Sequence, residues 1–229
     1  MAGARRANPL ALAVLVLLYE QPMHPYQMSA TLKERHKEDS IKINYGSLYS
    51  VVESLRRRGL IEARETVRAG NRPERTVYAI TEPGEREMID WLSQLLSDPV
   101  KEFPQFEAAL SLMPALPPDR AIELLERRLA TQQATLEASR ELMNRAYKIG
   151  MPRLFGVEHE YEVAILAAEV EFLSHLVDDL RDGLFTGLAG WRRLHELRNQ
   201  GLSQDEVESI LMTEFKEEFS WIDQLDEFS

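Results

Sequence analysis

The residues best suited to recognise another molecule lie in residues 44–61, which read NYGSLYSVVESLRRRGLI. Read as a helix, this stretch has small and hydroxyl side chains near its start, three consecutive arginines near its end and then a glycine. Short side chains let a helix approach base edges in the major groove of DNA, while arginines bind phosphates. A basic helix end is also an ordinary solvated face that suits the helix dipole, so the arginines alone do not establish DNA binding.

The periodicity of this stretch predicts a helix with one buried face. At 100° per residue, four aliphatic side chains cluster on one side: Leu48, Val51, Val52 and Leu55. The opposite side carries Gly46, Tyr49, Ser50, Glu53 and Arg57. Asn44 is expected to cap the start of the helix, and Gly59 stands where a C-terminal glycine belongs.

Two helices are expected before this one and a hairpin after it. The first helix covers about Pro9 to Glu20, is apolar nearly all round as a central core helix would be, and has Asn8 as its N-cap. Pro25 starts a second helix, over about residues 26–36. Two β-branched runs, 60–67 and 75–80, follow the third helix and predict a pair of strands.

The segment between the two strands, RAGNRPE, supplies turn-forming residues and positive charge. It carries Arg68 and Arg72, and Arg75 opens the second strand. Three short helices followed by a two-stranded β-wing with a basic tip are the order of a winged helix-turn-helix. The sequence therefore predicts a mainly α-helical protein with this domain at its N-terminal end.

Charge is divided unevenly along the 229 residues. The net charge is −11, but residues 1–80 hold 13 Lys and Arg against 8 Asp and Glu, whereas residues 81–229 hold 14 against 30. The first part can approach phosphates and the second is repelled by them. The chain has no cysteine, which excludes disulfides, thiolate metal sites and cysteine nucleophiles and fits a reducing compartment.

An apolar run near the start, LALAVLVLLY after Arg5 and Arg6, resembles part of a signal peptide. The sequence EQPMHP follows it in place of a small-residue cleavage pattern, and the run is far shorter than the roughly 20 residues that cross a bilayer. We therefore interpret it as a buried helix and expect a cytoplasmic protein without membrane contact.

Three segments together resemble the N-terminal domain of PadR-type transcriptional regulators: LAVLVLLYEQPMHPYQMSATL, GSLYSVVESLRRRGLIEAR and RTVYAITEPGE. The order Gly46–Ser47–Leu48–Tyr49 is the most specific part, and the similarity covers residues 9 to about 96. The resemblance implies a homodimer that binds double-stranded DNA, usually as a repressor, with the third helix in the major groove and the hairpin on the backbone or minor groove. Pro25 departs from the family, which commonly has glycine there.

The resemblance assigns the groove-facing positions to Ser47, Tyr49 and Ser50 and the wing positions to Arg72 and Arg75. With neighbouring polar and basic residues, the expected DNA-contacting set is Tyr26, Lys42, Asn44, Ser47, Tyr49, Ser50, Arg57, Arg68, Arg72 and Arg75. A symmetric dimer implies an inverted-repeat operator with half-sites about 34–36 Å apart. The alternative function is a winged-helix scaffold for protein complexes that does not bind DNA, although a scaffold has no need of a basic hairpin beside an acidic body.

The remaining chain, residues 98–229 after a DNA-binding domain of residues 1–97, is expected to be helical, to dimerise and to sense an effector. Thr81 is expected to cap a helix ending near residue 96, and a short helix near 105–112 precedes a long one with Asp119 in its first turn. The long helix carries a heptad seam, interrupted by polar members: Ile122, Leu125, Leu129, Gln132, Leu136, Ser139, Met143 and Ala146.

A further helix, about residues 158–182, carries two apolar stripes, so one is expected to pack within the chain and the other between subunits. The first stripe includes Val163, Leu166, Val170, Leu173, Val177 and Leu180, and the second consists of Tyr161, Ile165, Ala168 and Phe172. The expected dimer interface is Ile122, Leu125, Leu129, Leu136, Met143, Leu166, Val170, Leu173 and Val177. A last, acidic helix is expected from Ser203, with one apolar stripe that continues through Phe215 to Ile222.

Catalytic and metal motifs are not found in the sequence. The five histidines lack the spacing of a zincin helix, and there is no Walker loop, GxGxxG or GxSxG. We therefore expect no enzyme, no cofactor and no metal site. The resemblance implies a small aromatic or nucleotide-type effector, for which the candidate aromatic residues are Trp91, Trp191, Trp221, Phe155 and Tyr161.

Overall fold

The computed structural model describes residues 8–38, 40, 41, 43, 45–67 and 75–219. The chain divides into two compact units, Met1–Glu102 and Phe103–Ser229. This division falls a few residues after the predicted boundary, while the roles assigned to the two parts remain predictions.

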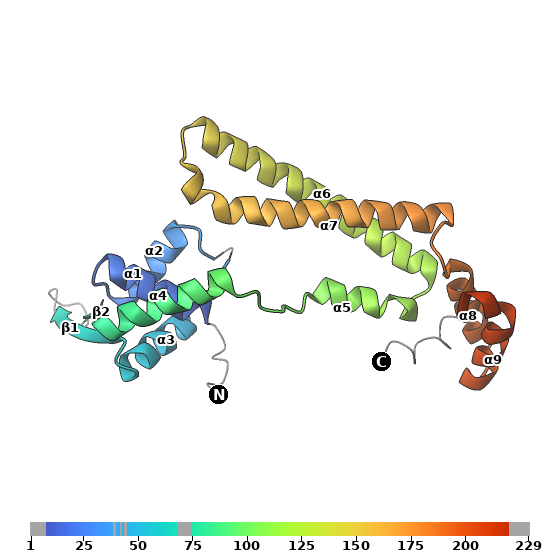
Figure 1. Cartoon of the computed structure of the whole chain (residues 1–229), viewed down its shortest axis with the longest axis horizontal. Helices are drawn as coiled ribbons and strands as arrows, with labels where there is room; N and C mark the ends of the chain where they lie inside the picture. Colours follow the sequence, from blue (N-terminus) through green and yellow to red (C-terminus); the bar gives the residue numbers. More distant parts are fainter. Residues whose placement is uncertain (1–7, 39, 42, 44, 68–74, 220–229) are drawn as a thin grey trace. The chain divides into compact units, whose positions relative to one another are not determined.

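The first unit contains four helices and one hairpin in its described part, and their order confirms the predicted fold class (Figure 1). The elements are α1 (Pro9–Glu20), α2 (Pro25–Glu34), α3 (Tyr45–Arg57), β1 (Ile61–Val67), β2 (Arg75–Ile80) and α4 (Glu82–Ser97). Helix α1 lies at the centre of the core, as its apolar sequence predicts, because five of its aliphatic side chains are at most 4% exposed: Leu10, Val14, Leu15, Leu17 and Leu18. Helices α3 and α4 and strand β2 all contact it.

Local capping residues fix the helix ends as predicted. The Asn8 side chain accepts a hydrogen bond from the Leu10 amide at 3.2 Å, and Thr81 accepts one from the Gly84 amide at 3.2 Å. Thr81 Oγ1 also donates to the Gly59 carbonyl at 2.7 Å, which joins the end of α3 to the start of α4. Gly59 has φ of 72°, a left-handed conformation that favours glycine after a helix.

The wing is an antiparallel pair in which Ile61 lies opposite Ile80, with an irregularity between Ala63 and Glu65. Tyr78 of β2 also exchanges backbone hydrogen bonds with Met23, at 2.9 and 3.0 Å. The turn before α2 is therefore tied directly to the wing.

The second unit is helical throughout the part that the structure describes. Its elements are α5 (Gln105–Ser111), the 3₁₀ turns η1 (Met113–Ala115) and η2 (Arg153–Phe155), α6 (Pro118–Lys148), α7 (Val157–Asp182), α8 (Leu188–Asn199), α9 (Gln204–Glu214) and α10 (Lys216–Phe219). Helices α6 and α7 pack side by side as an antiparallel hairpin (Figure 1).

Two sequence predictions about helices need correction. Helix α2 ends at Glu34 rather than near residue 36, and His36 adopts a left-handed φ of 53°. The last helix is not continuous, because Phe215, with φ of −120° and ψ of 32°, separates α9 from α10. The part of the predicted stripe beyond Phe219 lies outside the described residues.

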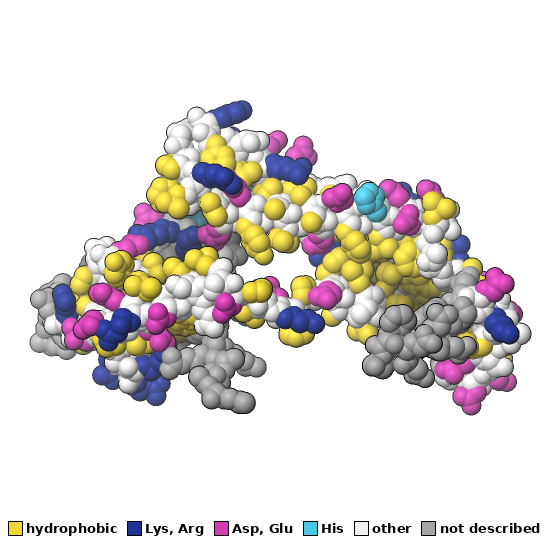
Figure 2. All heavy atoms as spheres, in the orientation of Figure 1, with side chains coloured by type: hydrophobic (Ala, Val, Ile, Leu, Met, Phe, Trp, Pro, Cys, Tyr) yellow, Lys and Arg dark blue, Asp and Glu magenta, His cyan; other side chains and the backbone are white. Residues whose placement is uncertain are grey.

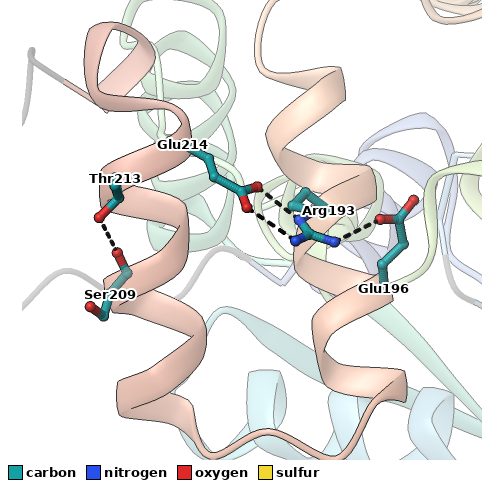
Figure 3. A network of polar contacts seen from close by, with 5 residues as sticks. All are labelled: Arg193, Glu196, Ser209, Thr213 and Glu214. Carbon is teal, nitrogen blue, oxygen red and sulfur yellow. Dashed lines mark hydrogen bonds and ion pairs between the residues drawn. The ribbon is translucent and has the colours of Figure 1, made fainter.

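Helix α8 was not predicted, although Leu188, Trp191 and Leu197 bury one of its faces. It contacts α9, and Arg193 of α8 binds Glu214 of α9 through Nε at 2.8 Å and a terminal nitrogen at 3.0 Å. A second terminal nitrogen of Arg193 donates to Glu196 at 3.3 Å (Figure 3). The predicted capping box of Ser203 and Glu206 is present at the start of α9.

Candidate nucleic-acid interface

Helix α3 is anchored by the face that its periodicity predicts. The four inward side chains are at most 8% exposed: Leu48, Val51, Val52 and Leu55. Contacts with α1, α2 and β1 surround this face. The opposite face is thereby held outward on a packed support, as a surface that reads another molecule requires.

Between Gly46 and Ser50, the outward surface of α3 carries little bulk apart from the ring of Tyr49. Gly46 and Ser50 are exposed, Ser47 is half-buried and Tyr49 is 55% exposed. Ser50 Oγ donates to the Gly46 carbonyl at 3.0 Å, so its hydroxyl proton is used within the helix and its oxygen remains an acceptor.

The three arginines at the end of α3 differ in their surroundings. Arg56 binds Glu53 on the same helix, at 2.9 and 3.0 Å, and Arg58 binds Glu87 of α4 at 2.5 Å. Arg57 is exposed and forms no ion pair with a residue that the structure describes. The end of α3 is therefore less positive than its sequence indicates, and Arg57 is the arginine most available to a phosphate.

Glu53 is affected by the same ion pair. Its hydrogen bonds with Arg56 lower the pKa of the Glu53 carboxyl from its ordinary value, because they favour the charged form. An anionic side chain thus stands on the exposed face of α3 between the hydroxyl-bearing half and the basic end. The sequence places Glu53 on that face, but the predicted DNA-contacting set does not contain it.

The start of α2 lies next to α3 and the wing. Tyr26 is 60% exposed, and its ring centroid is 6.2 Å from that of His24, whose Nδ1 accepts a hydrogen bond from the Gln27 amide. A hollow of about 340 Å³ is lined by Tyr26, Tyr49 and Tyr78 among other residues. The fold therefore brings Tyr26 and Tyr49 together at one surface, although 23 sequence positions separate them.

Several predicted contact residues cannot be located in this surface. Lys42, Asn44, Arg68 and Arg72 lie outside the described residues, and Arg75 begins β2 with a side chain that is not described.

A larger groove, of about 780 Å³, lies behind α3, between that helix, α1 and α4. Trp91 and Leu95 of α4 and Val51 and Leu55 of α3 supply apolar lining. Acidic and basic side chains also line it: Arg58, Glu87, Asp90 and Asp98. Trp91, one of the aromatic residues predicted to bind an effector, thus lines this groove, and acidic residues of the same helix line it too.

The other aromatic candidates lie in different surroundings. Trp191 is 8% exposed, and its Nε1 donates to the Leu116 carbonyl at 2.8 Å, as in a packed core. Phe155 and Tyr161 are 74% and 71% exposed, and Trp221 lies outside the described residues.

The residues predicted for a dimer interface all pack within one chain. They belong to two apolar clusters of the second unit, in which Leu125, Leu136, Leu166, Leu173 and Val177 are buried and Ile122, Leu129, Met143 and Val170 are partly buried. The polar members of the seam also have internal partners, since Gln132 donates to Glu169 at 3.0 Å and His159 bonds the Ser139 carbonyl at 3.1 Å. Within one chain the seam is thus partly covered by α7, and its place in a dimer interface stays a prediction.

No element in the part of the chain that the structure describes covers the second stripe of α7. Tyr161 is 71% exposed, Ile165 55% and Phe172 49%. Hydrophobic side chains are visible along the α6–α7 hairpin in Figure 2. An apolar face of this kind on a helix that is already packed on its other side indicates a further partner.

No group of three or more metal-binding side chains occurs among the described residues. Within the same part of the chain, none of the helices has the length and apolar character needed to cross a membrane.

Comparison with known proteins gives a family match for the first unit. A family profile described as "Transcriptional regulator PadR-like family" matches residues 14–90, which confirms the resemblance predicted from the sequence. No curated protein matches the chain.

Solved structures share the fold. Bacillus subtilis PadR in complex with operator DNA is 20% identical, with a TM-score of 0.61, over 75% of this chain and 99% of that chain. Bacillus subtilis PadR in complex with p-coumaric acid is 17% identical, with a TM-score of 0.58, over 78% and 99%. The PadR-like regulator BC1756 from Bacillus cereus is 18% identical, with a TM-score of 0.51, over 76% and 99%.

Proposed function

From the PadR-like transcriptional regulator domain at residues 14–90, we propose that this chain binds a specific DNA operator and represses transcription by occupying it. The carrying observation is the exposed face of α3, with small and hydroxyl side chains at one end and arginines at the other. The packed core of the first unit holds this face outward. Bacillus subtilis PadR, which has the same fold, has been solved on operator DNA.

In the proposed complex, α3 enters the major groove and the wing follows the sugar–phosphate backbone. Ser47, Tyr49 and Ser50 contact base edges, and Arg57 contacts phosphates. The surrounding DNA contacts are made by Tyr26, Lys42, Asn44, Arg68, Arg72 and Arg75.

We further propose that the chain acts as a homodimer on an inverted repeat. The exposed stripe of α7 supports this assembly, because Ile165 and Phe172 would otherwise leave large apolar surfaces in water. The outer stripe of α7 thus adds to the interface residues predicted from the sequence, several of which are only partly buried within the chain.

A small aromatic effector is proposed to bind the groove behind α3 and release the DNA. Trp91 offers an aromatic surface there, and Val51 and Leu55 connect the groove to the recognition helix. A ligand that displaced these residues would move the helix that reads the operator. Bacillus subtilis PadR has been solved with p-coumaric acid, an aromatic acid.

The first test is a fluorescence-anisotropy titration of the full chain against the upstream DNA of its own gene, at two salt concentrations with excess random competitor. Arg72→Ala should weaken binding to every sequence and reduce the salt slope by about one, because one phosphate contact is lost. Ser50→Ala and Tyr49→Phe should instead change the preference among operators. Arg140→Ala on α6 is the matched control and should leave binding unchanged.

A salt-dependent affinity that survives competitor and responds to these variants in this way supports the proposal. Equal, weak binding to upstream DNA and to a randomised duplex pool would favour the scaffold. If Arg72→Ala changed neither the affinity nor the salt slope, the wing assignment would be wrong.

A further inference from the structure

Glu53, the acidic residue on the exposed face of α3, holds the neighbouring Arg56 in an ion pair. The Glu53 carboxylate accepts hydrogen bonds from Arg56 Nε at 3.0 Å and from a terminal nitrogen at 2.9 Å. Both side chains are about half exposed, at 48% and 49%. Exposed pairs at this spacing contribute little to folding, so a role in recognition is separable from a role in stability.

Glu53 lies on the part of α3 that would face the DNA, where a charge has a strong effect on binding. It lies on the same face as Ser50 and Arg57 and lines the hollow that contains Tyr26 and Tyr49. A carboxylate on this surface repels phosphates. The two guanidinium nitrogens of Arg56 that bind Glu53 are also less available to phosphates.

Base chemistry gives the carboxylate one favourable partner in the major groove. Cytosine presents an amino donor there, whereas guanine presents only acceptors, and a carboxylate is an acceptor. Glu53 would therefore be stabilised opposite cytosine and destabilised opposite guanine.

We propose that Glu53 determines specificity by suppressing binding to non-operator DNA. On such DNA it keeps Arg56 from the phosphates. On the operator it accepts a hydrogen bond from a cytosine amino group, and Arg56 is released to the backbone. This inference rests on the proposed function, because it requires α3 to lie in the major groove.

The test begins with the wild-type full chain, which selects an operator from a pool of randomised duplexes. Its dissociation constants for the selected operator and for a shuffled duplex are then measured across a salt series. Glu53→Gln, which keeps the shape and removes the charge, should bind the shuffled duplex roughly three- to tenfold more tightly. Its salt slope on that duplex should be steeper by about one, because Arg56 gains a phosphate contact.

Operator binding should not improve in this variant, so the ratio of the two affinities should fall by a similar factor. Repeating the selection with Glu53→Gln should also relax the preference for cytosine at one position in each half-site. Glu53→Ala should change the ratio in the same direction. Circular dichroism and thermal melting should match the wild type for both variants.

Two further variants separate the proposed mechanism from a general charge effect. Glu123→Gln is the matched control, because Glu123 is also an exposed helical carboxylate bound by arginines, Arg120 and Arg127, but lies on α6. It should leave the affinity ratio unchanged. When Arg56→Gln is added to Glu53→Gln, the double variant should lose most of the affinity for the shuffled duplex that Glu53→Gln alone gains.

The outcomes distinguish the inference from the proposed function. If the wild type selects no sequence, DNA recognition fails and the inference fails with it. If the wild type selects an operator and Glu53→Gln keeps both the affinity ratio and the salt slope, only the inference is overturned. The same holds if Glu123→Gln changes the ratio as much as Glu53→Gln does.

Discussion

Two glycines show how single positions constrain this chain. A Cβ at Gly84, in the first turn of α4, would overlap the Leu60 carbonyl oxygen and lie 2.8 Å from Ile80 Cγ1. A Cβ at Gly156 would instead meet the ring end of Tyr147, with its Cζ at 3.0 Å. Backbone cannot yield as a side chain can, so Gly84 is the more constrained residue.

Gly84→Ala should therefore destabilise the first unit by about 2–4 kcal/mol. Alanine's better helix propensity, about 1 kcal/mol, is too small to offset the overlap with backbone. Urea unfolding followed by circular dichroism measures the loss.

Gly156→Ala is the matched substitution. It should destabilise the chain clearly less, because the Tyr147 side chain can rotate away and give up its hydrogen bond to Glu160. Equal losses in the two variants would contradict the packing described for Gly84.

At the scale of elements, α7 has two apolar sides with different partners. Its inner stripe packs against α6, and Arg128 and Gln132 of α6 both donate to Glu169 beside that seam. Its outer stripe is exposed and supports the proposed dimer.

Ile165→Glu on the outer stripe should convert the dimer to a monomer, because a charge would be buried without a partner in the interface. The association constant should fall at least about a hundredfold, which is the loss expected when a central interface residue is replaced. Sedimentation velocity over a concentration series gives the mass, and circular dichroism should show an intact fold.

Leu184→Glu, at a residue that is 71% exposed just beyond the end of α7, is the control and should leave the mass unchanged. A dimer that persisted in Ile165→Glu would move the interface away from the outer stripe.

At the scale of the whole molecule, charge is distributed in opposite senses between the two parts of the chain. Residues 1–80 carry a net charge of +5 and residues 81–229 a net charge of −16. The acidic character begins in α4, whose Asp90 lines the groove behind α3, as does Asp98 just beyond its end. The groove should therefore bind a cationic aromatic compound more tightly than an aromatic acid.

This preference can be tested with a planar aromatic cation, such as a phenanthridinium, and p-coumaric acid. In the absence of DNA, the cation should quench tryptophan fluorescence at a lower concentration than the acid, and Trp91→Phe should remove most of the quenching. Asp90→Asn should weaken binding of the cation but not of the acid, while Asp178→Asn on α7 should leave the binding of both compounds unchanged. Tighter binding of p-coumaric acid would contradict the role given to the carboxylates.

Features decided by neighbouring residues could be predicted from the sequence alone. Asn8 and Thr81 cap their helices as predicted, and the spacing of Leu48 and Leu55 identified the buried face of α3. These features follow from bonds and side-chain directions within one or two turns of backbone. The PadR-like domain was recognisable for the same reason, since its motifs are short and contiguous.

Features that depend on distant residues were decided only by the tertiary structure. Arg58 pairs with Glu87, 29 positions away, so the basic end of α3 is partly neutralised. The sequence shows an apolar heptad seam on α6, but only the structure shows that α7 folds back against it and buries Leu125 and Leu136 within the chain. Periodicity shows that a face must be buried but does not identify the surface that covers it, because hydrophobic burial is non-directional and the covering surface depends on how the whole chain folds.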